Sequence, residues 1–159
     1  SEGWVEAHGT LIHWRGTRGA ARLVLHGPAG EMVEPRADEI AIDVPGHGLS
    51  DAADDMLAVI AAARAALGAG EIVWPALPAG EPARLYPDLT PDRFGGHLLK
   101  AWSAARAEAI FAPWYAASAA AARPLAEGAL DPAAIAMRAR ARLRAGSAAR
   151  HWHDILQRR

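Results

Sequence analysis

The sequence predicts an α/β fold in which a small, partly parallel sheet is followed by a helical region. Short apolar runs, each bounded by glycine or proline, fill the first half of the chain, and one segment between them has the 3.6-residue period of a helix. The second half is rich in alanine, the best helix former, and has no strand pattern. We therefore expect a sheet region, residues 1–78, and a helical region, residues 79–159, within one compact unit.

Length and composition exclude several classes of protein. The chain has 159 residues, is 52% hydrophobic and carries a net charge of −1, as expected for one globular unit that does not bind nucleic acid. No apolar run reaches the roughly 18 residues of a membrane span, and the first residues do not resemble a signal peptide. We therefore expect no membrane association and a cytoplasmic location. Cysteine is absent, which excludes disulfides, thiolate metal sites and a cysteine nucleophile.

The sheet region contains a predicted hairpin and three further strands. Residues 4–15 alternate in polarity around Gly9, which lies where a tight turn is needed. Residues 22–26 and 39–44 are short apolar runs typical of strands buried on both faces, and residues 72–74 form a third run. Because a helix separates the last two runs, their order favours a partly parallel sheet.

Residues 56–67 are predicted to form that helix. Asp54 and Asp55 fall in its first turn, where the helix dipole favours carboxylates, and Gly68 suits its C-terminal cap. The apolar face of the helix consists of Met56, Ile60, Ala63 and Leu67.

Three more helices are predicted in the helical region. The pair Thr90-Pro91 begins the first, with threonine as the N-cap and proline at the first helical position, and Asp131-Pro132 begins the second in the same way. The pair Gly146-Ser147 separates the second helix from the third. The apolar stripe expected on the first of these helices consists of Leu98, Trp102, Ala105 and Ala109.

Several stretches of the chain resemble the α/β-hydrolase superfamily. They are an opening hairpin, HGTLIHW at residues 8–14, a strand with a His-Gly loop, LVLHGPAG at residues 23–30, and the segment IDVPGHGLSD at residues 42–51. Residues 91–115 are similar to the helical cap of certain bacterial members. The resemblance implies a truncated α/β-hydrolase-like sheet followed by a helical cap region, with the loop at residues 26–27 supplying part of an oxyanion hole.

The nucleophile of this superfamily is missing from its expected place. It normally lies in a G-x-S-x-G motif on a strand-to-helix elbow. After the predicted strand at residues 72–74 the chain reads PALPAG, and neither proline nor leucine can attack a carbonyl. Ser50 follows Gly48 at a position that the family uses structurally. The family's acid and histidine follow its cap, where this sequence stops, so we expect a degenerate member without Ser-His-Asp hydrolysis.

Candidate acid–base groups are nevertheless present, namely His26, Asp43, His47 and His97. The loop of His26 and Gly27 either directs N–H groups toward an oxyanion or only shapes a buried turn. Asp43 and His47 form either an acid–base pair or the frame of a loop in which the carboxylate accepts from backbone N–H groups; we favour the loop. His97 either packs in the helical core or faces a pocket.

The predicted binding site is a small apolar ligand pocket between the sheet and the helical region. Its aromatic members either line that pocket or belong to the core. We expect neither a metal nor a cofactor, because His151 and His153 point to different helix faces and no cluster offers four ligands. The residues expected at the pocket are His26, Gly27, His97, Trp102, Phe111, Trp114 and Tyr115.

Three functions are compatible with these features. The favoured one is a non-catalytic α/β-hydrolase relative that keeps the apolar pocket. The second is an enzyme, a hydrolase or lyase, that uses His and Asp side chains as acid–base groups without a covalent intermediate. The third is one half of a split hydrolase whose elbow and triad come from a partner chain. Because so small a sheet leaves an edge uncovered, we also expect a homodimer or larger assembly, with the cap helices or the strand near Trp74 at the interface.

Overall fold

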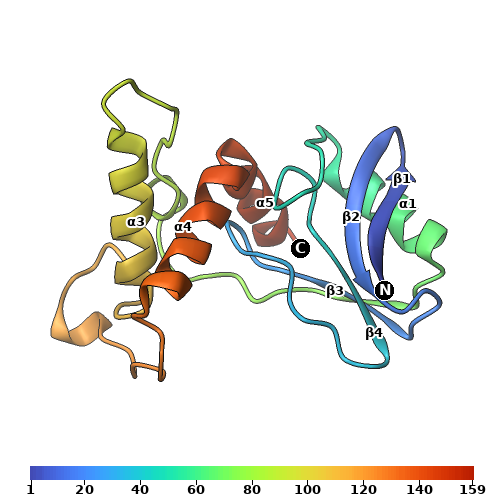
Figure 1. Ribbon diagram of the computed structural model, residues 1–159, viewed down its shortest axis with the longest axis horizontal. Helices are drawn as coiled ribbons and strands as arrows, with labels where there is room; N and C mark the ends of the chain where they lie inside the picture. Colours follow the sequence, from blue (N-terminus) through green and yellow to red (C-terminus); the bar gives the residue numbers. More distant parts are fainter.

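The five strands form one mixed sheet, seen in a computed structural model that describes residues 1–159 (Figure 1). The strand order is β1-β2-β4-β3-β5, with antiparallel pairing of β1 with β2 and of β2 with β4. Strand β3 lies parallel to both β4 and β5, so the predicted α/β fold with a partly parallel sheet is confirmed. The strands are β1 (Glu2–Ala7), β2 (Thr10–Gly16), β3 (Arg22–Leu25), β4 (Glu39–Ile42) and β5 (Glu71–Val73).

The predicted hairpin is formed by β1 and β2 around a two-residue turn. Ala7 pairs with Thr10, and the two residues between them have positive φ, 53° at His8 and 75° at Gly9. Positive φ at both central positions is the signature of the hairpin turn whose twist matches that of the strands.

Helix α1 (Met56–Leu67) has the residues of the predicted helix, but its first turn differs. Asp55 precedes the helix as its N-cap and accepts a hydrogen bond from the Ala58 N–H at 3.0 Å. The prediction that Asp54 and Asp55 lie within the first turn is therefore wrong, because a side chain that caps the helix must stand before it. Gly68 closes the helix in the left-handed conformation, as predicted.

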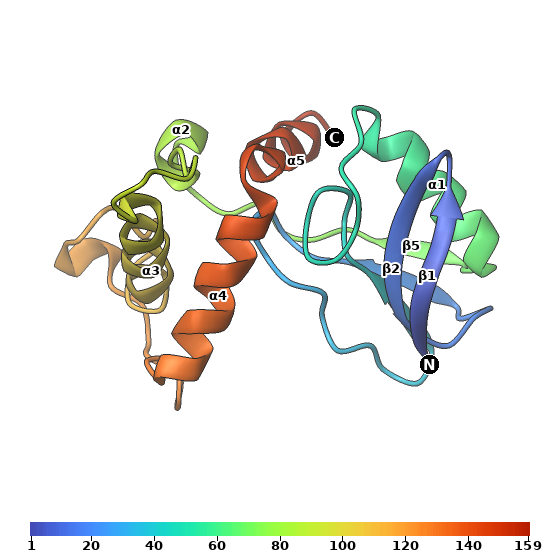
Figure 2. The ribbon, with the colours of Figure 1, turned by 45° about the horizontal axis from the view of Figure 1, so that its top comes forward.

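The main hydrophobic core lies between the sheet, α1 and the last helix, α5 (Ser147–Gln157). Trp152 and Ile155 of α5 belong to this core, although they come from the second half of the chain. Figure 2 shows α5 between the sheet with α1 and the rest of the helical region. The division of the chain at residue 78 stays a prediction. The core of the sheet includes part of α5, so residues from both sides of that boundary share one core. The sheet contributes Ile12, Trp14, Leu23, Leu25, Ile40 and Ile42, and α1 contributes Met56, Val59, Ile60, Ala63 and Leu67.

The second half is helical, as predicted, and α3 and α4 lie at the end of the molecule opposite the hairpin (Figure 1). Asp131 precedes α4 with Pro132 at its first position, and Gly146 separates α4 from α5, as expected. No helix is both long and apolar enough to cross a membrane. The remaining elements are α2 (Pro82–Leu85), α3 (Gly96–Glu108), the short 3₁₀ helix η1 (Ala119–Ala121) and α4 (Pro132–Ala145).

Helix α3 begins later than predicted. The Asp92 carboxylate accepts hydrogen bonds from the N–H groups of Phe94, Gly96 and His97, at 2.8, 3.2 and 3.1 Å. These bonds hold residues 92–95 in a loop, so the helix starts at Gly96 and the pair Thr90-Pro91 does not begin it.

The apolar stripe predicted for α3 is also wrong in part. Helix α3 packs on α4 through Ala101 and Ala105, which meet Ile135 and Ala139 in a small separate core. Leu98 and Trp102 are instead 53% and 38% exposed. Small side chains allow two helix backbones to approach closely, which explains why the alanine face is the buried one.

Candidate functional site

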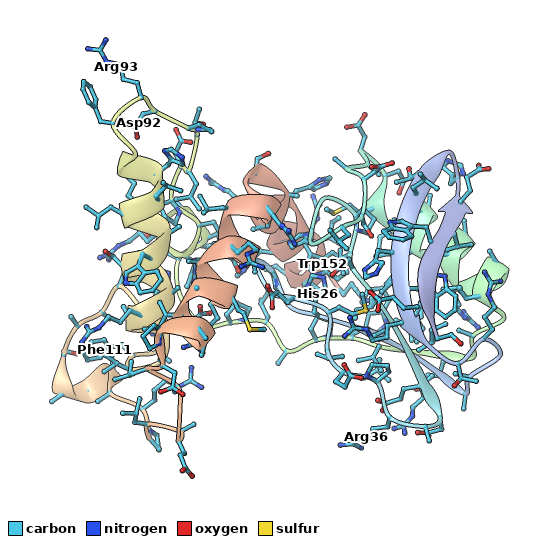
Figure 3. The ribbon with its side chains drawn as sticks, viewed as in Figure 1. His26, Arg36, Asp92, Arg93, Phe111 and Trp152 are labelled. Carbon is cyan, nitrogen blue, oxygen red and sulfur yellow. The ribbon has the colours of Figure 1, made fainter.

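His26 lies directly after β3, at the junction of the sheet and α5. Its Nε2 accepts from the Val44 N–H at 3.0 Å, so the proton is assigned to Nδ1, which donates to the Gly27 carbonyl at 2.8 Å. The Trp152 indole N–H donates to the His26 carbonyl at 3.0 Å, and Figure 3 shows these two residues together at the centre of the molecule. Burial lowers the pKa of His26, which keeps the ring neutral.

His47 packs edge-on against His26, with 5.1 Å between the ring centres. Its Nδ1 donates to the Pro45 carbonyl at 3.2 Å, and its Nε2 accepts from the Ala29 N–H at 3.3 Å. Burial and, to a smaller extent, the neighbouring His26 lower the pKa of His47 to about 4. Both imidazoles are thus neutral, and both use each ring nitrogen to hold the backbone.

Asp43 supports the loop that follows β4. Its Oδ2 accepts from the Leu49 N–H at 3.0 Å, and its carbonyl accepts from the Ser50 hydroxyl at 2.7 Å. The loop wraps the carboxylate so closely that a Cβ on Gly48 would lie 2.2 Å from Asp43 Cγ. These contacts are those of a group that builds a loop.

His13 is the partner of Asp43 that sequence reasoning missed. Its Nδ1 lies 2.9 Å from Asp43 Oδ2 and its Nε2 lies 2.8 Å from Glu2 Oε1, so each ring nitrogen meets a carboxylate. The imidazole is buried, whereas Glu2 is half exposed. The alternation of the hairpin places His13 on a strand, but only the pairing of β2 beside β4 brings it to Asp43.

His97 is far from these groups. Its Nδ1 accepts from the N–H of Asp92, a residue that precedes α3, at 3.2 Å. Figure 3 shows Asp92 at the outer end of α3, away from His26. The structure therefore brings Asp43, His26 and His47 together and leaves His97 apart.

The predicted aromatic residues lie in the helical region, separate from the His26 loop. The Trp114 indole N–H donates to the Leu85 carbonyl at 3.0 Å, and the Tyr115 hydroxyl accepts from the Glu81 N–H at 2.7 Å, so both hold the segment around α2. Phe111 forms an isolated β-bridge with Ala122 near the end of α3.

No sharp turn from strand to helix follows β5. The chain runs without helix from residue 74 to residue 81, and α2 begins at Pro82. No serine hydroxyl forms a hydrogen bond with an imidazole, and Ser50 is engaged by the Asp43 carbonyl. No group of three His, Asp or Glu side chains is arranged to hold a metal ion.

A groove of about 620 Å³ lies between the segment after α2 and the corner of α4 and α5. A narrow cavity of about 10 Å³ shares Tyr86, Pro87, Leu89 and Gly146 with this groove and reaches Ala29, beside Gly27. Neither is lined by His26, Asp43 or His47. The groove is lined by Ala83, Tyr86, Pro87, Asp88, Leu89, Thr90, Pro91, Leu143, Gly146, Ser147 and Arg150.

No protein-family model and no curated protein matches this sequence. Among solved structures, a membrane phospholipase A described as a bacterial virulence factor matches with 14% identity and a TM-score of 0.48. The N-formylmaleamic acid deformylase of Pseudomonas putida S16 matches with 15% identity and a TM-score of 0.44, and the Cif epoxide hydrolase of Acinetobacter nosocomialis with 16% and 0.42. These matches cover 99%, 96% and 98% of this chain. The chain spans 63%, 72% and 65% of the matched chains, so less than two thirds of the first and third.

Proposed function

We propose that this chain is a degenerate α/β-hydrolase-like protein that does not perform Ser-His-Asp hydrolysis and instead binds a small apolar ligand where the helical region meets the sheet. The observation that carries the proposal is the segment after β5. It has neither a nucleophile nor the sharp turn into a helix on which the superfamily places its serine. The likeness to the superfamily rests on the His-Gly loop directly after β3 and on the D-x-P-G-H-G-x-S-D segment directly after β4.

The hydrogen bonds of the two buried imidazoles support the same proposal. A general base needs a free nitrogen within reach of the substrate. His26 and His47 each accept from a backbone N–H and donate to a carbonyl, and neither lines a hollow large enough for a substrate. The enzyme that uses these residues for acid–base chemistry is therefore the less favoured alternative.

The groove of about 620 Å³ is the pocket we assign to the ligand, since its volume falls in the range of small-molecule sites. Leu89, Pro91 and Leu143 give it apolar walls. All of its lining residues belong to the helical region, and it borders α5, the helix that packs on the sheet.

Two measurements test this function. The hydrolysis of short p-nitrophenyl esters is followed for the wild type and for Ser50→Ala and Ser147→Ala; we expect no turnover that either substitution abolishes. Binding of 1-octanol is followed by amide chemical shifts, and we expect saturable changes at Tyr86, Leu89 and Leu143. Ester turnover that the wild type shows and one variant loses would contradict the proposal. The absence of saturable 1-octanol binding would also contradict it.

A split hydrolase is the second candidate, and the position of β5 favours it. This strand ends the sheet, so its outer edge is free to pair with a strand from another chain. Purification from the native source should then bring down a partner that carries a G-x-S-x-G elbow.

The proposal also includes the formation of a homodimer. Leu98 and Leu99 of α3 are 53% and 68% exposed, which gives the helical region an apolar outer face. Sedimentation over a range of concentrations should reveal a dimer, whereas a monomer at every concentration would contradict it.

A further inference from the structure

Arg150 brings a positive charge to the α5 side of the groove between the segment after α2 and the corner of α4 and α5. Its side chain is exposed, lines the groove and forms no hydrogen bond or ion pair within the chain. The other arginine nearby, Arg142, is neutralised by Glu108, whose Oε2 lies 3.1 Å from its Nη2. A ligand that enters the groove therefore meets one free cation.

Arg142 places a buried donor beside the narrow cavity that adjoins the groove. The residue is 5% exposed and lines the narrow cavity of about 10 Å³. Its Nη1 donates to the Leu85 carbonyl at 3.1 Å, but its buried Nε has no hydrogen-bond partner. An unpaired buried donor is costly, and a cavity of about 10 Å³ has room for no more than one water molecule as its partner.

The amino end of α5 adds further donors. Gly146 precedes this 11-residue helix and has no side chain to cap it, and Gly146 and Ser147 both line the groove. The first N–H groups of a helix have no partner inside the helix and favour negative charge. Together with Arg150, one turn into the same helix, they make this wall of the groove attractive to an anion.

The groove also contains one negative charge, the carboxylate of Asp88. The Asp88 carboxylate accepts from the N–H and hydroxyl of Thr90, at 2.9 and 2.6 Å, and the cation that acts on it is Lys100. Asp88 thus belongs to the wall formed by the segment after α2, opposite α5. The Tyr86 hydroxyl lies 2.9 Å from His153 Nδ1, and burial raises the pKa of Tyr86 and lowers that of His153, so this pair is neutral.

We propose that the groove binds a small carboxylate with an apolar body. The carboxylate lies against Arg150 and the amino end of α5, and the apolar body lies along Leu89, Pro91 and Leu143. This inference rests on the proposed function, because it names the ligand class of the same pocket. An arginine is suited to it, since its planar group donates two parallel hydrogen bonds to a carboxylate.

Octanoate and 1-octanol test the inference, because they share an apolar chain and differ in charge. We expect the wild type to bind octanoate about tenfold more tightly than 1-octanol, which corresponds to one charge-assisted hydrogen-bonding site. Arg150→Gln should remove that preference by weakening octanoate binding, and Arg150→Lys should retain part of it. The matched control is Arg140→Gln, which removes an equally exposed charge from α4 outside the groove.

The outcomes separate the two proposals. If 1-octanol and octanoate bind equally well, the carboxylate inference fails and the apolar pocket stands. If neither 1-octanol nor octanoate binds at the groove residues, the carboxylate inference and the proposed apolar pocket both fail. If Arg140→Gln weakens octanoate binding as much as Arg150→Gln does, the preference comes from the net charge of the protein and the inference is overturned.

Discussion

At the scale of single residues, the loop after β4 depends on the absence of a side chain at Gly48. This residue has a φ of 53°, and a Cβ there would lie 2.2 Å from Asp43 Cγ. Gly48→Ala combines the cost of a left-handed backbone with a steric overlap against a buried carboxylate. We expect it to lower the free energy of unfolding by about 3 kcal/mol, measured by urea denaturation.

Gly9→Ala is the matched control. Gly9 also has a positive φ, 75°, but a Cβ there would meet no atom within 4 Å. The cost should therefore be about 1 kcal/mol, the backbone term alone. Equal losses in the two variants would show that the Asp43 contact does not decide the residue at position 48.

The same loop shows how far single residues can be predicted. The sequence segment of residues 42–51 predicts a tight loop and favours Asp43 as a frame for backbone N–H groups, and the structure has such a bond from Leu49. It does not predict that His13 approaches Asp43 from another strand, because strand pairing is a long-range property. The separation of His97 from the other candidates could not be predicted for the same reason, because the residues around His97 do not determine how far α3 lies from β3.

At the scale of elements, α5 ties the helical region to the sheet. Trp152 is completely buried in the core of the sheet, and its indole N–H donates to the His26 carbonyl at 3.0 Å. Trp152→Phe removes this donor and leaves a space beside Trp74. We expect a loss of about 3 kcal/mol in the free energy of unfolding. Trp102→Phe, on the outer face of α3, should cost far less, and comparable losses would contradict the role given to α5.

The contact of α3 with α4 depends on small side chains. Ala105 is completely buried against Ile135 and Ala139. Ala105→Leu should destabilise the protein by about 2 kcal/mol, because the added volume forces the helices apart. Ser103→Leu adds a similar side chain on the exposed face of the same helix and should change stability by about 0.5 kcal/mol or less. Thermal unfolding of both variants gives the comparison.

Element existence was easier to predict than the buried face of an element. The pair Asp131-Pro132 predicts one helix start and the pair Gly146-Ser147 predicts the separation of two helices, and the structure has both, although the Asp131 side chain forms no capping hydrogen bond. The start of α3 at Gly96 depends on three hydrogen bonds to the Asp92 carboxylate, which the more familiar Thr-Pro signal obscured. The face of α3 was misjudged because a leucine or tryptophan stripe normally marks the buried side, whereas here alanines pack on α4.

At the scale of the whole molecule, the two hydrophobic cores differ greatly in size. The core of the sheet, α1 and α5 contains 17 buried residues, whereas that of α3 and α4 contains 4. A region with few buried apolar contacts opens at lower free energy than the rest of a protein. Native-state hydrogen exchange should therefore show weaker protection for the amides of α3 than for those of α1, and equal protection would contradict this.

The stability of the whole chain should also depend on pH through the two buried imidazoles. The pKa of His47 is about 4 in the folded protein and 6.5 in the unfolded chain, and burial lowers that of His26 as well. As the pH falls below 6.5, the unfolded chain binds protons that the folded protein does not, so stability decreases toward pH 4.

For His47 alone the loss is about 3 kcal/mol, since each pKa unit corresponds to about 1.4 kcal/mol. Urea denaturation between pH 7 and 5, where most carboxylates stay ionised, should register about 2 kcal/mol of this loss. His47→Gln should start from lower stability at pH 7 and lose less on acidification, whereas a slope equal to that of the wild type would assign the pH dependence to other groups.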